Sequence, residues 1–132
     1  MGGGENKLKI SDMVKLLKSF KYAAHGLKFC FKTQQNFRIH LLAAIIVVIG
    51  GICLYIDLLQ WIAVTICISA VLATELMNTA IEKICDHINP SHHPQIKVIK
   101  DVAAGAVLVI AIMSLVTGLL IIVPAIFNRI NS

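Results

Sequence analysis

Four polar side chains of the kinds that perform chemistry recur at helical spacing near the middle of the sequence. Glu75, Asn78, Glu82 and Asp86 follow one another at intervals of three, four and four residues. On a helix of 3.6 residues per turn, this spacing places all four on one face. Carboxylates can accept a proton as general bases and can bind a hard cation such as Mg²⁺. The spacing therefore predicts one helical face that holds both a catalytic base and a metal ligand.

This face continues a segment that we expect to cross a membrane, because residues 58 to 73 carry no charge. A carboxylate in or next to hydrocarbon costs roughly 3 kcal/mol or more unless it faces protein, water or a partner charge. Such residues are functional candidates. The alternative is a juxtamembrane helix whose acids are merely solvated, but a solvated helix would not confine its acids to one face.

The two glutamates are expected at different depths. Residues 58 to 76 form about 28 Å of helix, close to the roughly 30 Å of the hydrocarbon core, so Glu75 is expected at headgroup level. Glu82 lies about 10 Å further into the cytoplasm. This arrangement suits transfer of a group from a water-soluble donor to a lipid alcohol, with Glu75 as base and Glu82 as Mg²⁺ ligand. Lys100 and Asp101 could add a phosphate-binding cation and a further acid, although Lys100 taken alone is better explained as an ordinary interfacial lysine.

The composition is that of an integral membrane protein. The 132 residues are 58% hydrophobic and 14% charged, with a mean hydropathy of +0.83. Three long runs are uncharged, at residues 41 to 56, 58 to 74 and 102 to 128. Together they make up nearly half of the chain and leave no room for a soluble catalytic domain.

We therefore expect an all-α membrane protein with one domain. The predicted parts are a disordered tail (1–10), an amphipathic surface helix (about 11–32), and spans at about 37–56, 58–86 including a cytoplasmic extension, and 100–128. The surface helix alternates apolar residues with lysines, and Arg38 and His40 mark the interface at the first span. The link around Asp57 is so short that the first two spans must form an antiparallel hairpin.

The basic residues predict the orientation. Of 12 Lys and Arg residues, eight precede the first apolar run, three lie between residues 83 and 100, and Arg129 follows the third run. By the positive-inside rule, the N-terminus and the link between spans two and three are cytoplasmic and the C-terminus is outside. The sequence lacks a GxxxxGK[ST] loop and a Gly-rich kinase loop, so any nucleotide would bind an unconventional site. Cys85 and the nearby histidines match no zinc ligand spacing.

Four segments carry a resemblance to a known family: FKYAAHGLK (20–28), NFRIH (36–40), ELMNTAIEKICD (75–86) and HHPQIKVIKDVAAGAVL (92–108). They resemble the small prokaryotic diacylglycerol kinase and undecaprenol kinase family over nearly the whole chain, from about residue 19 to 109. The resemblance implies an ATP- and Mg²⁺-dependent lipid kinase of the inner, cytoplasmic membrane. It also implies a homotrimer with active sites between protomers.

Carried over by position, Glu75 resembles the family's catalytic base and Glu82 its metal ligand. Asn78, Lys100 and Asp101 match active-site positions that support the nucleotide and the transferring phosphate. The other implied nucleotide contacts are Lys15, where some members use an arginine, Tyr22, and the loop residues Ser91, His92 and His93.

Gln34 is a departure from the family pattern, which usually has a glutamate sharing the metal with the position of Glu82. An amide oxygen is a weaker Mg²⁺ ligand than a carboxylate. Either Glu82, phosphate and water hold the metal, or activity is reduced. The competing hypothesis is thus a catalytically weak lipid-binding or scaffold protein of the same fold, although the joint presence of the other site residues argues against it.

The lipid substrate is expected to be undecaprenol or diacylglycerol. Residues 102 to 106 read VAAGA and offer no hydroxyl or amide side chain to bind an ester. A site without such groups has little means of selecting diacylglycerol. The KDVAAGAVL segment is also more similar to the undecaprenol kinases, so we favour undecaprenol.

Overall fold

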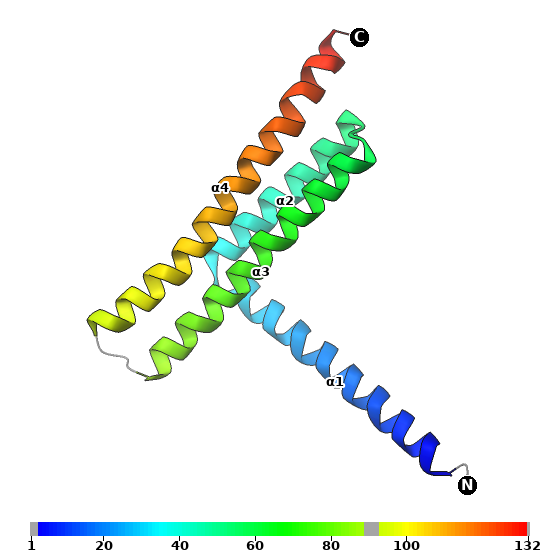
Figure 1. The fold of residues 1–132 in the computed structure, drawn as a ribbon, viewed down its shortest axis with the longest axis vertical. Coiled ribbons are helices and arrows are strands. Elements are labelled where there is room, and N and C mark those ends of the chain that lie inside the picture. The colour runs from blue at the N-terminus through cyan, green and yellow to red at the C-terminus, as the bar shows by residue number, and fades with distance from the viewer. Residues whose placement is uncertain (1–2, 89–92, 132) are drawn as a thin grey trace. The chain divides into compact units, whose positions relative to one another are not determined.

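The computed structural model describes residues 3 to 88 and 93 to 131, with side chains from Asp12 onward. Over these residues the chain is all helix, without strands: α1 (Gly3–Thr33), α2 (Gln35–Leu54), α3 (Leu58–Ile88) and α4 (Pro94–Ile130) (Figure 1). The helices fall into two units, residues 1–34 and 35–132, and each is described by itself. Helices α2, α3 and α4 are long and apolar enough to cross a membrane. The all-α membrane class is confirmed.

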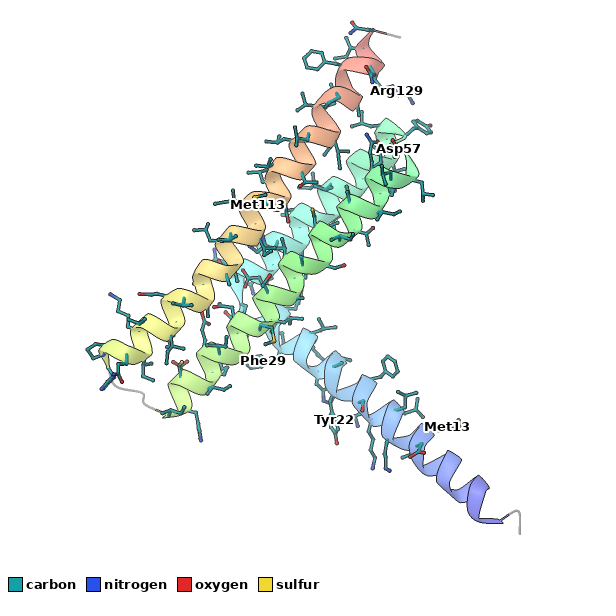
Figure 2. The ribbon with its side chains drawn as sticks, viewed as in Figure 1. Met13, Tyr22, Phe29, Asp57, Met113 and Arg129 are labelled. Atoms are coloured by element: carbon teal, nitrogen blue, oxygen red, sulfur yellow. The ribbon has the colours of Figure 1, made fainter. Side chains whose placement is uncertain are left out.

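Helix α1 begins earlier than the sequence predicted. It starts at Gly3 rather than near Ser11, and so runs through most of the segment expected to be a disordered tail. Residues 5 to 10 contain no proline or glycine, so this stretch has no residue that breaks a helix. Apolar side chains of α1 such as Met13 and Phe20 are 64% and 68% exposed, so its placement on a membrane surface stays a prediction. Figure 2 shows Met13 and Tyr22 along this helix.

A tight hairpin joins α2 to α3, as the sequence predicted. Tyr55 has a positive φ of 54°, and the Ile56 N–H donates back to the Gly51 carbonyl over 3.2 Å. Gly51 lies close to the turn: a Cβ at this position would lie 3.0 Å from Ile56 Cδ1 and Trp61 Cη2, so these side chains would have to shift by a few tenths of an ångström. Glycine at position 51 therefore favours the close packing of Ile56 and Trp61 over the turn.

Asp57 begins α3 with a reciprocal cap. The Gln60 N–H donates to Asp57 Oδ1 over 2.9 Å, and the Asp57 N–H donates to Gln60 Oε1 over 3.0 Å. Two of the N–H groups that a helix start leaves unpaired are thereby satisfied.

Helix α4 starts at Pro94, about six residues before the predicted start of the third span. A proline inside a helix would kink or break it. Proline instead occupies the first turn, where its missing N–H costs nothing, and His93 Nδ1 accepts from the Gln95 N–H over 3.3 Å. Similarly, α3 continues to Ile88, two residues past the predicted boundary.

The three long helices pack side by side, with the most extensive contact between α3 and α4 (Figure 1). Their buried cluster is small and centres on Ile56, Val64 and Ile121, with Val47 and Trp61 packed against it. Most large apolar side chains point outward instead, for example Leu108 and Leu120 at 61% and 72% exposure. Apolar exposure on this scale is expected of a protein surrounded by lipid.

Candidate functional site

The acidic face of α3 points inward at one end and outward at the other. Among the described residues, the buried polar side chains are Glu75, Asn78 and Thr79, which are 3%, 8% and 4% exposed. Glu82, two turns later, is half-buried, and Asp86 is exposed. The predicted face therefore exists, and it passes from a dry environment to an open one along α3.

Glu75 faces a histidine from α2. His40 Nε2 lies 3.3 Å from Glu75 Oε1, and the two side chains are 26% and 4% exposed. One turn further along α3, the Thr79 hydroxyl donates to the Glu75 backbone carbonyl over 2.9 Å, within the helix. The carboxylate itself has the His40 imidazole nitrogen beside it, an arrangement that suits an oriented general base.

Asn78 and Glu82 form the next contact along the face. Asn78 Nδ2 donates to Glu82 Oε1 over 3.0 Å. Asn78 Oδ1 is buried and has no hydrogen-bond partner among the described residues. An unpaired buried carbonyl lowers the folding stability by on the order of 1–3 kcal/mol. A hydrogen-bond donor or a cation from outside the three-helix unit would satisfy this oxygen.

Lys100 connects α4 to the open end of the face. Its Nζ contacts Asp86 Oδ1 in an ion pair whose side chains are 37% and 52% exposed. Asp86 is 28 residues after Leu58, about 42 Å of helix, and so lies beyond the roughly 30 Å hydrocarbon core. The hydrogen bond from Lys100 lowers the pKa of Asp86 below its ordinary value. Asp101, next to Lys100, is exposed.

The remaining predicted site residues precede α2 or lie between α3 and α4 in the sequence. Tyr22 is exposed, Lys15 pairs with Asp12 at 3.3 Å, and the Gln34 N–H donates to the Cys30 carbonyl over 2.8 Å. These three belong to the N-terminal unit, which is described by itself. Ser91 and His92 lie outside the described residues, and His93 caps α4. No group of three or more His, Cys, Asp or Glu within the described ranges is arranged to hold a metal ion.

An apolar groove of about 360 Å³ lies between α2, α3 and α4. Its lining includes Val47 on α2, Val71 on α3 and Gly118 on α4, and His40 also lines it. His40 therefore borders the groove and contacts Glu75 at the same time. The sequence predicted His40 only as an interfacial residue, because no periodic pattern links one position on the first span to one on the second.

Comparison with known proteins places these residues in a family. The model of the prokaryotic diacylglycerol kinase family matches residues 21–122. An undecaprenol kinase of Bacillus subtilis (strain 168) is 39% identical over 114 residues, which cover 86% of this chain and 93% of that protein. A diacylglycerol kinase of Synechocystis is 35% identical over 114 residues, 86% of this chain and 65% of that protein. The diacylglycerol kinase of Escherichia coli (strain K12) is 24% identical over 107 residues, 81% and 88% of the two chains.

The family match covers most of the chain, including every described residue of the acidic face and both of its partners from α2 and α4. The chain belongs to the prokaryotic diacylglycerol kinase family and is a lipid kinase.

Proposed function

We propose that this protein transfers the γ-phosphoryl group of ATP, with Mg²⁺, to the hydroxyl of a membrane lipid alcohol at the cytoplasmic interface. The main support is Glu75, a buried carboxylate beside a histidine that lines an apolar groove. Glu75 would accept the hydroxyl proton while the alcohol oxygen bonds to phosphorus and the bond to the ADP oxygen breaks. Positioning and electrostatics supply most of the catalysis in such transfers.

The chain offers oxygen ligands that fit Mg²⁺. The Asn78 Oδ1 atom is buried without a partner and lies on the residue that contacts the Glu82 carboxylate. Mg²⁺ prefers one or two carboxylates together with phosphates and waters. Glu82 and Asn78 would hold it, with Gln34 as a weaker neutral ligand. When bound, the ion would neutralise negative charge on the phosphates.

The nucleotide is proposed to bind at the open end of the acidic face. Lys100 would exchange Asp86 for a phosphate oxygen, with Asp101 beside it. Lys15, Tyr22, Ser91, His92 and His93 are the further proposed nucleotide contacts. In this arrangement the phosphates bind at the exposed end of the acidic face of α3, and the lipid alcohol binds at its buried end.

Orientation and assembly follow from the same proposal. The N-terminus would lie in the cytoplasm and the C-terminus outside the inner membrane, because eight basic residues precede residue 41 and three lie between residues 83 and 100. The surface helix would correspond to α1. A homotrimer with shared sites is supported by the exposed apolar faces of α2 to α4 and by the unpartnered Asn78 Oδ1.

Undecaprenol is the proposed lipid. The relative named undecaprenol kinase shares 39% identity with this chain, whereas those named diacylglycerol kinase share 24% to 35%. The groove lining is almost wholly apolar, as a bare isoprenoid chain would require.

Turnover of ATP by the purified protein with mixed lipid alcohols tests the function. Phosphate should appear on a polyprenol, and transfer to no lipid alcohol would refute kinase activity. Comparing a polyprenol with a diacylglycerol in the same detergent mixture tests the substrate. A tenfold preference for diacylglycerol would overturn our choice.

A further inference from the structure

His40 is the described side chain that connects the apolar groove to the buried carboxylate. It lines the groove, and its Nε2 lies 3.3 Å from Glu75 Oε1. The imidazole is half-buried, and Glu75 is almost fully buried. Glu75 is not among the groove-lining residues, so His40 is the residue through which the groove and the carboxylate are in contact.

A carboxylate as buried as that of Glu75 needs a polar neighbour. A carboxylate next to hydrocarbon is costly unless a partner stabilises it, and rotation about its terminal torsion is soft unless a donor fixes one oxygen. An imidazole has only two side-chain torsions and one neutral N–H, so it is well suited to fix a carboxylate in a single orientation. Catalytic contacts of this kind are often long without substrate and shorten when the reacting complex forms.

We propose that His40 is a positioning residue for Glu75, a role that rests on the proposed function. Its Nε2–H donates to Oε1 and holds the other carboxylate oxygen toward the lipid hydroxyl that arrives along the groove. His40 does not itself take the hydroxyl proton. The imidazole ring also forms one wall of the groove, so it sets where the alcohol stops relative to the base.

Three substitutions of His40 distinguish its hydrogen-bond donation to Glu75 from the volume of its side chain and from its ability to transfer a proton. In His40→Gln, the amide nitrogen reaches about as far as Nε2 and donates, but it does not titrate. In His40→Asn, the amide is too short to reach Glu75. In His40→Leu, most of the bulk remains without a donor. Thr65→Val is the matched control, because Thr65 is exposed on the same helix as Glu75 and its hydroxyl bonds only the Trp61 carbonyl of that helix.

The full-length variants are assayed in one detergent mixture with a polyprenol and Mg²⁺-ATP, and kcat and both KM values are measured. We expect His40→Leu and His40→Asn to lower kcat about tenfold or more, with KM for ATP within about twofold. His40→Gln should retain at least about a third of wild-type kcat, and Thr65→Val should match wild type.

Two results would overturn the proposal. One is a His40→Leu or His40→Asn enzyme that keeps more than half of wild-type kcat. The other is a His40→Gln enzyme as slow as His40→Leu although it unfolds at the wild-type temperature, because then the imidazole itself is needed. Glu75→Gln is assayed in parallel. If it is inactive while His40→Leu is normal, only this inference fails; if Glu75→Gln is fully active, the proposed base fails as well.

Discussion

The polar groups toward the two ends of the three-helix unit differ in their burial and in their pairing. At the hairpin end, Asp57 is paired with Gln60 in a helix cap, and the Arg129 guanidinium lies 4.6 Å from the centre of the Tyr55 ring. Figure 2 shows Asp57 and Arg129 at this same end. These polar groups are exposed and engaged with protein, which is the pattern of structural residues.

Toward the other end, Glu75 and Asn78 are buried and only partly paired, whereas Asp86 and Lys100 beyond them form an ion pair. Glu75 has one neighbour at 3.3 Å, and Asn78 keeps a buried oxygen without a partner among the described residues. Burial of an incompletely paired polar group lowers stability, so its presence is better explained by a ligand than by folding. Substitutions at this end should therefore alter chemistry, and substitutions at the hairpin end should alter stability.

Glu75→Gln should have the largest effect. Loss of a positioned base lowers the rate about 10²- to 10⁴-fold, while nucleotide affinity should be nearly unchanged because Glu75 lies at the dry end of the face. Turnover and equilibrium binding of a nucleotide analogue are measured on the same preparation. A variant with more than about a tenth of wild-type turnover would exclude Glu75 as the base.

Glu82→Gln should weaken Mg²⁺-ATP binding itself. The substitution keeps the side-chain shape and an oxygen that can accept from Asn78 Nδ2 but removes the carboxylate charge that a hard cation prefers. The measurement is the Mg²⁺ concentration for half-maximal activity, which should rise. An unchanged magnesium dependence would contradict the metal assignment.

Gln34→Glu should have a smaller effect in the opposite direction. If Gln34 is a weak ligand in the proposed site, a carboxylate at this position should lower the magnesium requirement. Activity is titrated with Mg²⁺ for the wild type and the variant side by side. A fall in activity at every magnesium concentration would instead favour a site rebuilt around the amide.

Asp57→Ala should change only stability. Loss of the helix cap costs about 0.5–2 kcal/mol, and kcat should remain within about twofold because Asp57 is at the hairpin end of α3, far in sequence from the acidic face. Thermal unfolding in detergent and turnover are measured together. A loss of kcat without a loss of stability would break the distinction between the two ends.

Periodicity was sufficient to predict the features that depend on a single helix. The intervals between Glu75, Asn78, Glu82 and Asp86 fixed a common face, and the face is present on α3. The uncharged runs similarly predicted three spans, which correspond to α2, α3 and α4. The proposed roles of these residues in catalysis and metal binding stay predictions.

Contacts between helices were not predictable in the same way. The pairs His40–Glu75 and Lys100–Asp86 depend on how far one helix is shifted along the next, and side-chain packing sets that register. The start of α4 was predicted about six residues too late for a different reason: proline ends one helix and starts another equally well, and only the backbone after His93 distinguishes the two.

The small buried cluster around Val64 has a consequence for how this protein must be handled. The chain itself shields few of its side chains. Contacts with the surrounding acyl chains therefore replace much of the side-chain packing that stabilises the interior of a water-soluble enzyme. Bilayer thickness and lipid composition then act on the folded state as a ligand would, through mass action. The same protein should therefore differ in stability between a short-chain detergent and a bilayer of matched thickness. Activities measured in the two media should be compared with that difference in mind.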